Sequence, residues 1–408
     1  IIRAAAPAVA PAVAPYSQFA CSKPNKRQRF SCSLSANAGL MTGRMLLWLW
    51  SSAGVATVML LLFQVLGAMN RRQKIFAILL LVFFSGMDML GAVLEGTLGN
   101  MMLPRKWPSG PHLEWWMNFK YQFSSNTTLL YWVFNQTIVA WLVTLLFLQE
   151  KDPRNYLFYG VACLFCAPFA AVGIAVLMIV KGVMFFFGKI REPLLVLKRI
   201  FSAQNVLSGI FLLLPVAAYL LSANAVGGDA ASVGGQEGVA FFSGEYFNGK
   251  FLLFILLEVG AYLLLIASDH YKNHLYYVLW ASFLIFPYFH IGRSLDFCMR
   301  ATIPALFVLM VYVGRYLLKH WKDKGMKNAC SWVLAVCLSI GIFTPAVEIY
   351  RGFYYTGLNK TIKLEDRSLM TFDKDDPNYN FVTQDPQEHF FFKHLAKQRK
   401  PNGQSLEQ

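Results

Sequence analysis

Charged side chains are scarce in this chain. Asp, Glu, Lys and Arg make up 14% of its 408 residues, against roughly 25% in soluble domains. Aromatic residues reach 15%, and the mean hydropathy is +0.44. Several nearly uncharged segments have the length that a helix needs to cross hydrocarbon, about 20 residues. This composition argues against a soluble helical bundle and predicts an all-α, polytopic transmembrane helical bundle.

Acidic residues are absent from residues 1–87, which carry nine Lys or Arg. This segment supplies most of the net charge of +15. Because cations near spans set membrane orientation, we interpret the excess as a topology and targeting signal, and we expect no nucleic-acid partner. Residues 1–40 are first rich in Ala, Pro and Val and then basic, which resembles an organelle transit peptide. A disordered tail, or initiation at Met41 or Met45, are the alternatives.

Several signatures of cofactor and metal chemistry are also missing. There is no P-loop, no GxGxxG and no zinc-type Cys/His spacing. Cys163 and Cys166 form a CxxC, but inside an apolar segment without a partner pair, so we interpret them as packing residues. We therefore expect no metal and no cofactor. Asn126, Asn135 and Asn359 lie in N-x-[ST] sequons, of which only Asn359 is predicted to be accessible.

Hydropathy and loop charge together predict the spans. One difficulty is the apolar segment 156–187, because as a single span it would place the basic stretch 189–203 outside. We resolve this conflict by splitting 156–187 into two helices near Pro168, where proline removes a backbone donor. The result is about nine to ten helices. The remaining spans are predicted at 45–69, 75–96, 127–149, 204–222, 251–268, 275–290, 301–318 and 329–347.

Three regions follow from these spans. Residues 1–40 form the leader, 41–347 the transmembrane domain, and 348–408 an outward-facing polar tail. Within the tail we expect a short helix near 386–398, whose Phe residues rest on the membrane domain. The protein is thus predicted to be an integral, multi-pass membrane protein. Which membrane, and the oligomeric state, stay open.

Ionisable groups within spans are costly and mark candidate functional sites. Asp88 lies toward the predicted outer end of the second span, seven residues before Glu95, so that both would share one helix face. Two such carboxyl groups suit a general base, a metal ligand or a proton relay. A helix cap or a hydrogen bond between spans is the alternative role for Asp88. Glu258 lies in the middle of a span and must be paired; its role stays open.

The outer loop 97–124 contains a second group of polar and aromatic residues. We expect Glu114 to join Asp88 and Glu95 as catalytic candidates, and His112, Trp115 and Trp116 to contact substrate, because tryptophan rings stack on sugars and lipids. Asn126 opens the next span within the polar run 124–128 and is a further ligand candidate. An interfacial anchor followed by a helix N-cap explains the same pattern.

A third group lies between two spans at the predicted outer end. Arg293 and Arg300 are seven residues apart, with Asp296 between them. If this segment is helical, both guanidinium groups share a face that suits phosphate. Snorkelling anchors with a surface ion pair are the alternative.

The order of these features resembles the GT-C class of membrane glycosyltransferases. Asp88 matches the acid that emerges after an early span, HLEWWMNFKYQFSSN matches the outer loop, and 156–187 matches the short paired spans. The resemblance implies that Asp88 is the base, that Arg293 or Arg300 binds phosphate, and that the donor is a polyprenyl-phosphate sugar. The sequence departs from the class because it lacks a paired DxD or DxE and the WWDYG-type signature. Strings around 122–136 and 296–308 also resemble uncharacterised bacterial multi-span proteins.

The leading hypothesis is therefore a glycosyltransferase-like enzyme that uses a lipid-linked sugar on the outer face of a membrane. The alternative is a transporter, or a lipid-binding or structural membrane protein without catalysis. Broken, polar helices near the bilayer middle are typical of transporters. Membrane lipid is an expected partner in each case.

Overall fold

A computed structural model describes residues 40–98, 112–117, 121–221, 239–241, 248–291, 296–322, 329–358 and 390–395 of the chain. Six helices in this part are long and apolar enough to cross a membrane, and a bent pair makes a seventh. The protein is thus an all-α, multi-pass helical bundle, as the composition predicts. Its main core contains large buried side chains from most of these helices, including Trp116, Trp141, Tyr262 and Phe307.

The first half of the bundle follows the predicted spans, with one break. The second span bends by 42° between Phe83 and Asp88, so it consists of two helices. The third span is likewise built from two shorter helices. The elements are α3 (Leu40–Leu66), α4 (Arg71–Phe83), α5 (Asp88–Leu94), the 3₁₀ turn η1 (Leu113–Trp115), α7 (Asn126–Trp132), α8 (Phe134–Gln149) and η2 (Pro153–Asn155).

The predicted split of residues 156–187 is confirmed. The segment forms α9 (Tyr156–Cys166) and α10 (Pro168–Gly188), with Pro168 in the first turn of α10. Proline is tolerated there because its missing N–H would have no partner within the helix. The next membrane-spanning segment runs from Pro193 to Leu220, so it begins earlier than the predicted 204–222. It contains α11 (Pro193–Ile200), α12 (Ala203–Ser208), the π-helix η3 (Gly209–Leu213) and α13 (Leu214–Leu220).

The second half of the bundle holds the most deeply buried span, α19 (Ile303–Lys322), which crosses its centre. The last span continues through Leu358, so residues 348–358, which we assigned to the polar tail, extend a helix. The other elements are β1 (Val239–Phe241), α15 (Gly249–Ile255), the π-helix η6 (Leu256–Gly260), α16 (Ala261–His270), α17 (His274–Ile285), η7 (Phe286–Tyr288), β2 (Phe289–Ile291), α18 (Asp296–Ala301), α20 (Ala329–Gly341), α21 (Phe343–Leu358) and η11 (Phe391–Leu395).

Two small elements complete the described structure. Strands β1 and β2 form a short antiparallel ribbon in which Ala240 pairs with His290. The π-helix η11 lies within the predicted tail helix, and the rings of Phe391 and Phe392 contact Tyr219 at 5.2 and 6.4 Å between centroids. The expected contact between the Phe residues of the tail and the membrane domain is therefore present.

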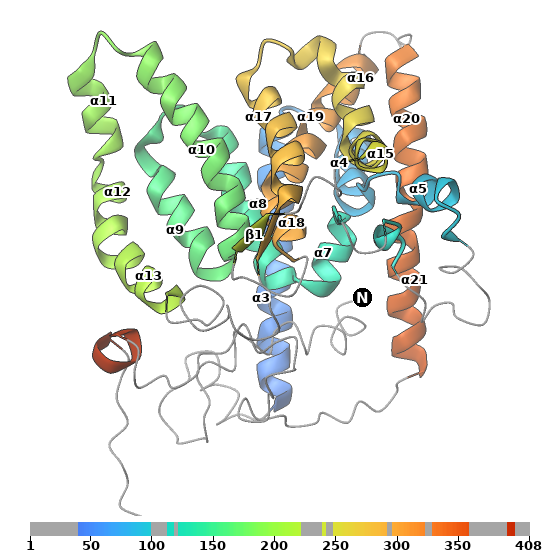
Figure 1. Ribbon diagram of the computed structural model, residues 1–408, viewed down its shortest axis with the longest axis horizontal. Coiled ribbons are helices and arrows are strands. Elements are labelled where there is room, and N and C mark those ends of the chain that lie inside the picture. The colour runs from blue at the N-terminus through green and yellow to red at the C-terminus, as the bar shows by residue number, and fades with distance from the viewer. Residues whose placement is uncertain are drawn as a thin grey trace, which may run out of the picture.

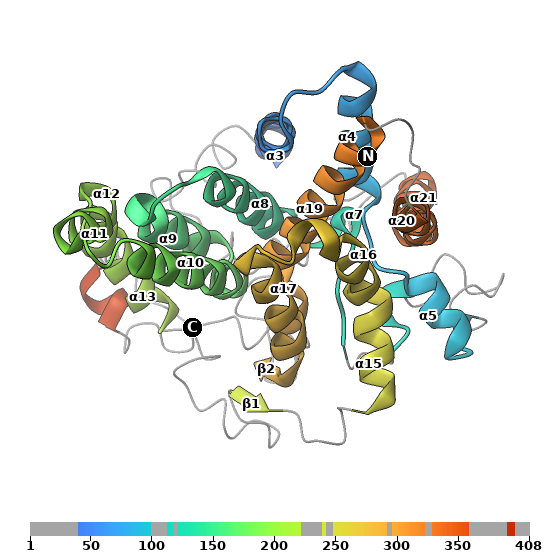
Figure 2. The ribbon, with the colours of Figure 1, turned by 90° about the horizontal axis from the view of Figure 1, so that it is seen from above.

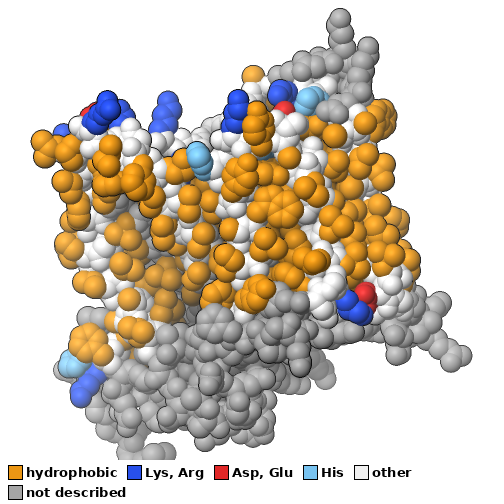
Figure 3. All heavy atoms as spheres, turned by 45° about the horizontal axis from the view of Figure 1, so that its top comes forward, with side chains coloured by type: hydrophobic (Ala, Val, Ile, Leu, Met, Phe, Trp, Pro, Cys, Tyr) orange, Lys and Arg blue, Asp and Glu red, His pale blue; other side chains and the backbone are white. Residues whose placement is uncertain are grey.

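The helices stand side by side, with turns at two opposite rims (Figure 1). The α3–α4, α10–α11 and α16–α17 connections lie at the upper rim of Figure 1, whereas the α9–α10 connection and the end of α21 lie toward the lower rim. Described Lys and Arg side chains gather along the upper rim, above a wide apolar band (Figure 3). We call this the basic rim, and the positive-inside rule assigns it to the inner side.

Seen along the helix axes, the α9–α13 helices extend to one side of the bundle, while α5, α15 and α20–α21 lie at the other (Figure 2). In this view α20 and α21 overlap end-on and form one rod. The break between α4 and α5, the π-helix η6 and the α20–α21 junction lie on this same side, where the acidic site described next is found.

Candidate acidic site in the membrane domain

Three carboxyl groups from distant parts of the sequence are buried together near the α4–α5 break. Asp88 begins α5, Glu258 lies in η6, and Glu114 comes from the outer loop. Their residues are only 1 to 2% exposed. Electrostatic contacts connect Asp88 with both of the others. We call Asp88, Glu114 and Glu258 the acidic site.

The helix break beside Asp88 is stabilised by hydrogen bonds from two neighbouring elements. The carbonyl oxygens of Leu81 and Val82 accept from the Asn126 amide (3.0 Å) and the Thr127 hydroxyl (2.6 Å). The backbone N–H of Met87 donates to the carbonyl of Leu257 at 3.2 Å. In a membrane, backbone groups released by a break must find partners within the protein. The surrounding fold therefore stabilises the break.

Glycine at position 86 allows the Glu258 carboxyl group to lie against this break. A Cβ atom at Gly86 would come within 1.8 Å of Oε2 of Glu258 and 2.9 Å of its Cα. Glu258 itself lies in a π-helical turn, a departure from α-helix that often occurs at functional sites. Its Oε1 accepts a hydrogen bond from the indole nitrogen of Trp116 at 2.9 Å.

Asp88 and Glu258 form a buried carboxyl pair. Oδ2 of Asp88 accepts from the hydroxyls of Ser85 (3.0 Å) and Thr344 (2.8 Å). Oδ1 of Asp88 and Oε2 of Glu258 find no donor in the described part of the chain, and the two carboxyl groups interact with each other. Because an ionised carboxylate only accepts, a hydrogen bond between these two groups requires that one of them be protonated.

Glu114 is held by the polar run that opens α7. Its Oε1 accepts from the backbone N–H of Ser125 (2.8 Å), and its Oε2 accepts from the Ser124 hydroxyl (2.7 Å) and the Gln122 amide (3.1 Å). Burial, together with the negative charge of Asp88, raises the pKa of Glu114 to about 8. No Lys or Arg of the described residues forms an ion pair with any of the three carboxyl groups.

In segment 112–116 of the outer loop, every second side chain contacts the helical bundle. Trp116 bonds Glu258, Glu114 lies beside Asp88, and His112 contacts Glu348 of α21 at 2.7 Å. Gly91 of α5 provides the room, because a Cβ there would approach the Trp116 ring to 2.5 Å. The described segment 112–116 thus packs against the acidic site.

The structure gathers five of the predicted site residues in this region: Asp88, His112, Glu114, Trp115 and Trp116. Trp115 lies beside the His112 ring, 4.5 Å between centroids, and donates to Gln122 at 3.2 Å. Asn126 is adjacent but uses its amide to bond Leu81, and it is only 3% exposed.

The other predicted residues lie elsewhere. Glu95 is the C-cap residue of α5 and, unlike Asp88, is only partly buried; its carboxylate pairs with Lys250 at 2.5 Å. Glu95 therefore lies outside the acidic site, and the shared helix face of Asp88 and Glu95 stays a prediction. Arg300 is half-buried at the end of α18. Arg293 and the Asp296 side chain lie outside the described residues.

Sequence reasoning missed two charged residues of this region. Glu348 and Arg351 are 4% and 9% exposed on α21, although we assigned them to a polar tail. The spacing Thr344, Glu348, Arg351 repeats at four and three residues and is typical of one helix face. That signal indicates that the helix continues past residue 347.

The acidic site differs from a metal centre and from the surface hollow of the basic rim. Across the described ranges, no three His, Cys, Asp or Glu side chains lie close enough to hold a metal ion.

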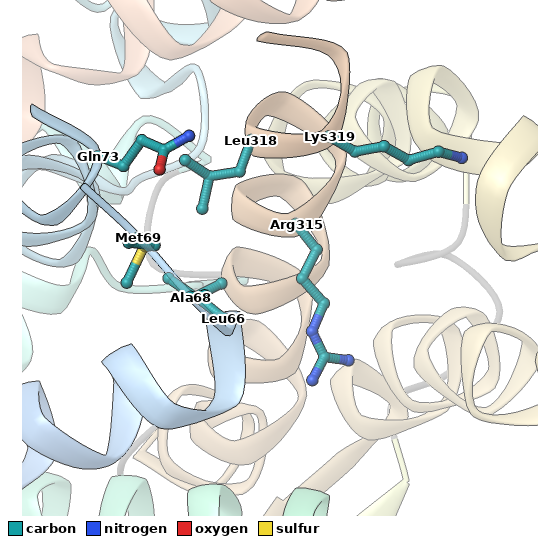
Figure 4. A pocket seen from close by; sticks show the side chains of 7 residues that line it. All are labelled: Leu66, Ala68, Met69, Gln73, Arg315, Leu318 and Lys319. Atoms are coloured by element: carbon teal, nitrogen blue, oxygen red, sulfur yellow. The ribbon is translucent and has the colours of Figure 1, made fainter. Parts of the chain in front are cut away.

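The hollow in Figure 4 lies between the α3–α4 turn and α19. Its Arg315 guanidinium donates to the carbonyl of Val65, and its Lys319 pairs with Asp269. The hollow is lined by Leu66, Ala68, Met69, Gln73, Arg315, Leu318 and Lys319.

Comparisons with family models, with curated proteins and with solved structures find no match to this chain. A function is therefore inferred from the acidic site itself.

Proposed function

We propose that this protein is a membrane enzyme of the glycosyltransferase type. It transfers the sugar of a polyprenyl-phosphate sugar to an acceptor at the outer face of the membrane. The observation that carries the proposal is the buried Asp88–Glu258 pair, in which Oδ1 of Asp88 and Oε2 of Glu258 have no donor among the described residues. With one of the two groups protonated, the pair offers a proton donor beside a proton acceptor. General acid–base catalysis needs this combination of a proton donor and a proton acceptor in one place.

The position of the pair supports chemistry at the rim opposite the basic rim. The outer-loop segment 112–116 supplies Glu114 and Trp116 to the same site, so the site is built partly from a loop that a substrate at this rim would meet. Trp115 and Trp132 flank His112 at 4.5 and 4.9 Å between ring centroids. Such faces suit the apolar side of a sugar or an isoprenoid chain.

In this mechanism Asp88 is the base. Its Oδ2 accepts from Ser85 and Thr344, and its Oδ1 has no donor among the described residues. An acceptor hydroxyl at Oδ1 would transfer its proton to Asp88 as the hydroxyl oxygen attacks the anomeric carbon of the sugar. The bond between that carbon and the phosphate oxygen breaks, and polyprenyl phosphate leaves. Because all three carboxyl groups are enclosed, a substrate reaches them only when segment 112–117 moves aside.

The test uses purified protein in vesicles that contain a polyprenyl-phosphate sugar, and follows release of the polyprenyl phosphate. Asp88→Asn keeps the size of the side chain but removes the base, so turnover should fall by about a hundredfold or more. Asp269→Asn makes the same chemical change at the basic rim, where Asp269 pairs with Lys319, and should leave turnover unchanged. Equal turnover of Asp88→Asn and wild type would contradict the proposal.

A second candidate, a proton-coupled transporter, is favoured by one specific observation. A broken span (α4–α5), a π-turn within a span (η6) and the α20–α21 junction meet at a buried carboxyl pair, and discontinuous helices commonly form transporter sites. The same vesicles distinguish the two. Uptake of protons into sealed vesicles with a candidate solute, without release of polyprenyl phosphate, would favour transport.

A further inference from the structure

A second buried group of ionisable residues lies beside the acidic site, at the contact between the outer loop and α21. Nδ1 of His112 and Oε1 of Glu348 are 2.7 Å apart, and the two residues are 6% and 4% exposed. A contact this short is typical of a hydrogen bond to an ionised partner. We call His112 and Glu348 the dyad.

The groups that face the dyad come from α7, η1 and α21. Arg351 lies 3.5 Å from Glu348, and the Trp132 indole donates to Oε2 of Glu348 at 3.4 Å. The Tyr131 hydroxyl is buried without a hydrogen-bond partner and feels the charge of Glu348. Arg351 and the Trp132 indole thus stabilise the negative charge of Glu348 beside the imidazole of His112.

The chemistry of the imidazole follows from which nitrogen is bonded. In the neutral ring, donation from Nδ1 to Glu348 leaves Nε2 as a proton acceptor. Nε2 has no hydrogen bond to any described residue. A carboxylate that orients one imidazole nitrogen while the other takes up a proton is a recurring arrangement in proton transfer.

The dyad and the carboxyl pair are joined through one face of α21. Thr344 donates to Asp88, and Glu348 follows four residues later, which is a rise of about 6 Å along the helix. From this point α21 runs toward the rim opposite the basic rim (Figure 1). The dyad therefore lies between the carboxyl pair and the outer side.

We propose that the His112–Glu348 dyad exchanges protons between the Asp88–Glu258 pair and the outer aqueous phase. Nε2 of neutral His112 accepts a proton that leaves the pair, directly or through water. Glu348 stabilises the resulting imidazolium, and Nε2 then releases the proton outward. This inference rests on the proton-transfer role of the pair in the proposed function, but its test needs no turnover.

The experiment follows the infrared C=O band of protonated carboxyl groups in the purified, lipid-reconstituted protein after transfer from H₂O to D₂O. Loss of one component of this band in Asp88→Asn and Glu258→Gln, with that component retained in Glu114→Gln, assigns the component to the pair. The rate at which the assigned band shifts reports proton exchange with the medium. We expect His112→Ala to slow this rate about a hundredfold, and added imidazole to restore it.

A matched variant distinguishes proton transfer by His112 from a purely structural role, in which His112 only holds the outer loop against α21. His112→Asn can still donate from its amide to Glu348 but cannot carry a proton at neutral pH. Exchange as slow in His112→Asn as in His112→Ala supports the proposal, whereas wild-type exchange in His112→Asn overturns it. Absence of the carboxyl band in the wild-type protein would remove both the dyad proposal and the proposed base, so the two failures are distinguishable.

Discussion

Two π-helical turns of equal length, η3 (Gly209–Leu213) and η6 (Leu256–Gly260), differ completely in their surroundings. In η3 no residue is buried, and Phe211 is 66% exposed on the lipid-facing side of its span. In η6 Leu257, Glu258, Val259 and Gly260 are all buried, and Glu258 contacts Trp116 and Asp88.

This difference shows that irregular backbone alone does not mark a site. A π-turn adds one residue to a helix and redirects nearby side chains. In η3 the redirected side chains are apolar and none is buried. Redirecting them therefore only exchanges one apolar side chain for another on the surface of the span. In η6 the turn places a carboxyl group against the α4–α5 break, where Gly86 leaves space for it.

The largest expected effect comes from filling the space beside η6. Gly86→Ala would place Cβ 1.8 Å from Oε2 and 2.9 Å from Cα of Glu258. Because backbone must shift, we expect a loss of about 3 kcal/mol or more in unfolding free energy, or failure to assemble. Thermal unfolding of the purified variant in detergent measures this loss of stability.

The control is the equivalent change at η3. A Cβ at Gly209 would meet only the flexible end of Leu157, at 3.3 Å. Gly209→Ala should therefore change stability little, or raise it, since alanine favours helix over glycine. Similar losses in both variants would mean that the two turns are equally sensitive, and the comparison would fail.

An intermediate effect is expected when the donor to Glu258 is removed. Trp116→Phe keeps an aromatic ring in the core but leaves Oε1 of Glu258 without its indole donor. We expect a loss of about 1 to 3 kcal/mol, the cost of an unsatisfied buried acceptor.

Trp141→Phe is the comparison for Trp116→Phe. Trp141 is just as buried and stacks on Phe307 at 5.1 Å, far from either π-turn. Trp141→Phe therefore measures the stability lost when a buried indole is replaced by a phenyl ring without loss of a hydrogen bond to Glu258. If both substitutions lower the melting temperature equally, the bond to Glu258 contributes nothing measurable.

The last expected effect is a pH dependence of stability. Burial raises the pKa of Glu114 from 4.5 to about 8, so folding favours its protonated form. The corresponding stability is complete below pH 4.5 and is lost as the pH rises through about 8. The melting temperature should therefore fall over this window.

Glu114→Gln should flatten that fall, because glutamine does not titrate, while Asp269→Asn at the basic rim should keep the wild-type slope. Melting curves collected at several pH values compare the three proteins. An unchanged slope in Glu114→Gln would show that Glu114 does not titrate in this window, and the pH dependence would belong to other groups.

The candidate site was only partly predictable. The intramembrane position of Asp88 and the packed His112, Glu114 and Trp116 were visible as local patterns. That Glu258 joins them was not, because its partner is 170 residues away along the chain, at Asp88. Glu348 was hidden for another reason: polar residues past an apolar run read as a tail, although α21 continues to Leu358.

The sequence by itself determined the class of protein, most of its spans and the split at Pro168. These features depend on apolar length, loop charge and proline geometry, which act locally. Only the tertiary structure decided where the span at Asp88 breaks, that Glu95 pairs with Lys250, and that Asp88 and Glu258 are buried beside each other. Those features depend on which buried groups from distant segments meet, and a membrane interior penalises every polar group left without a partner.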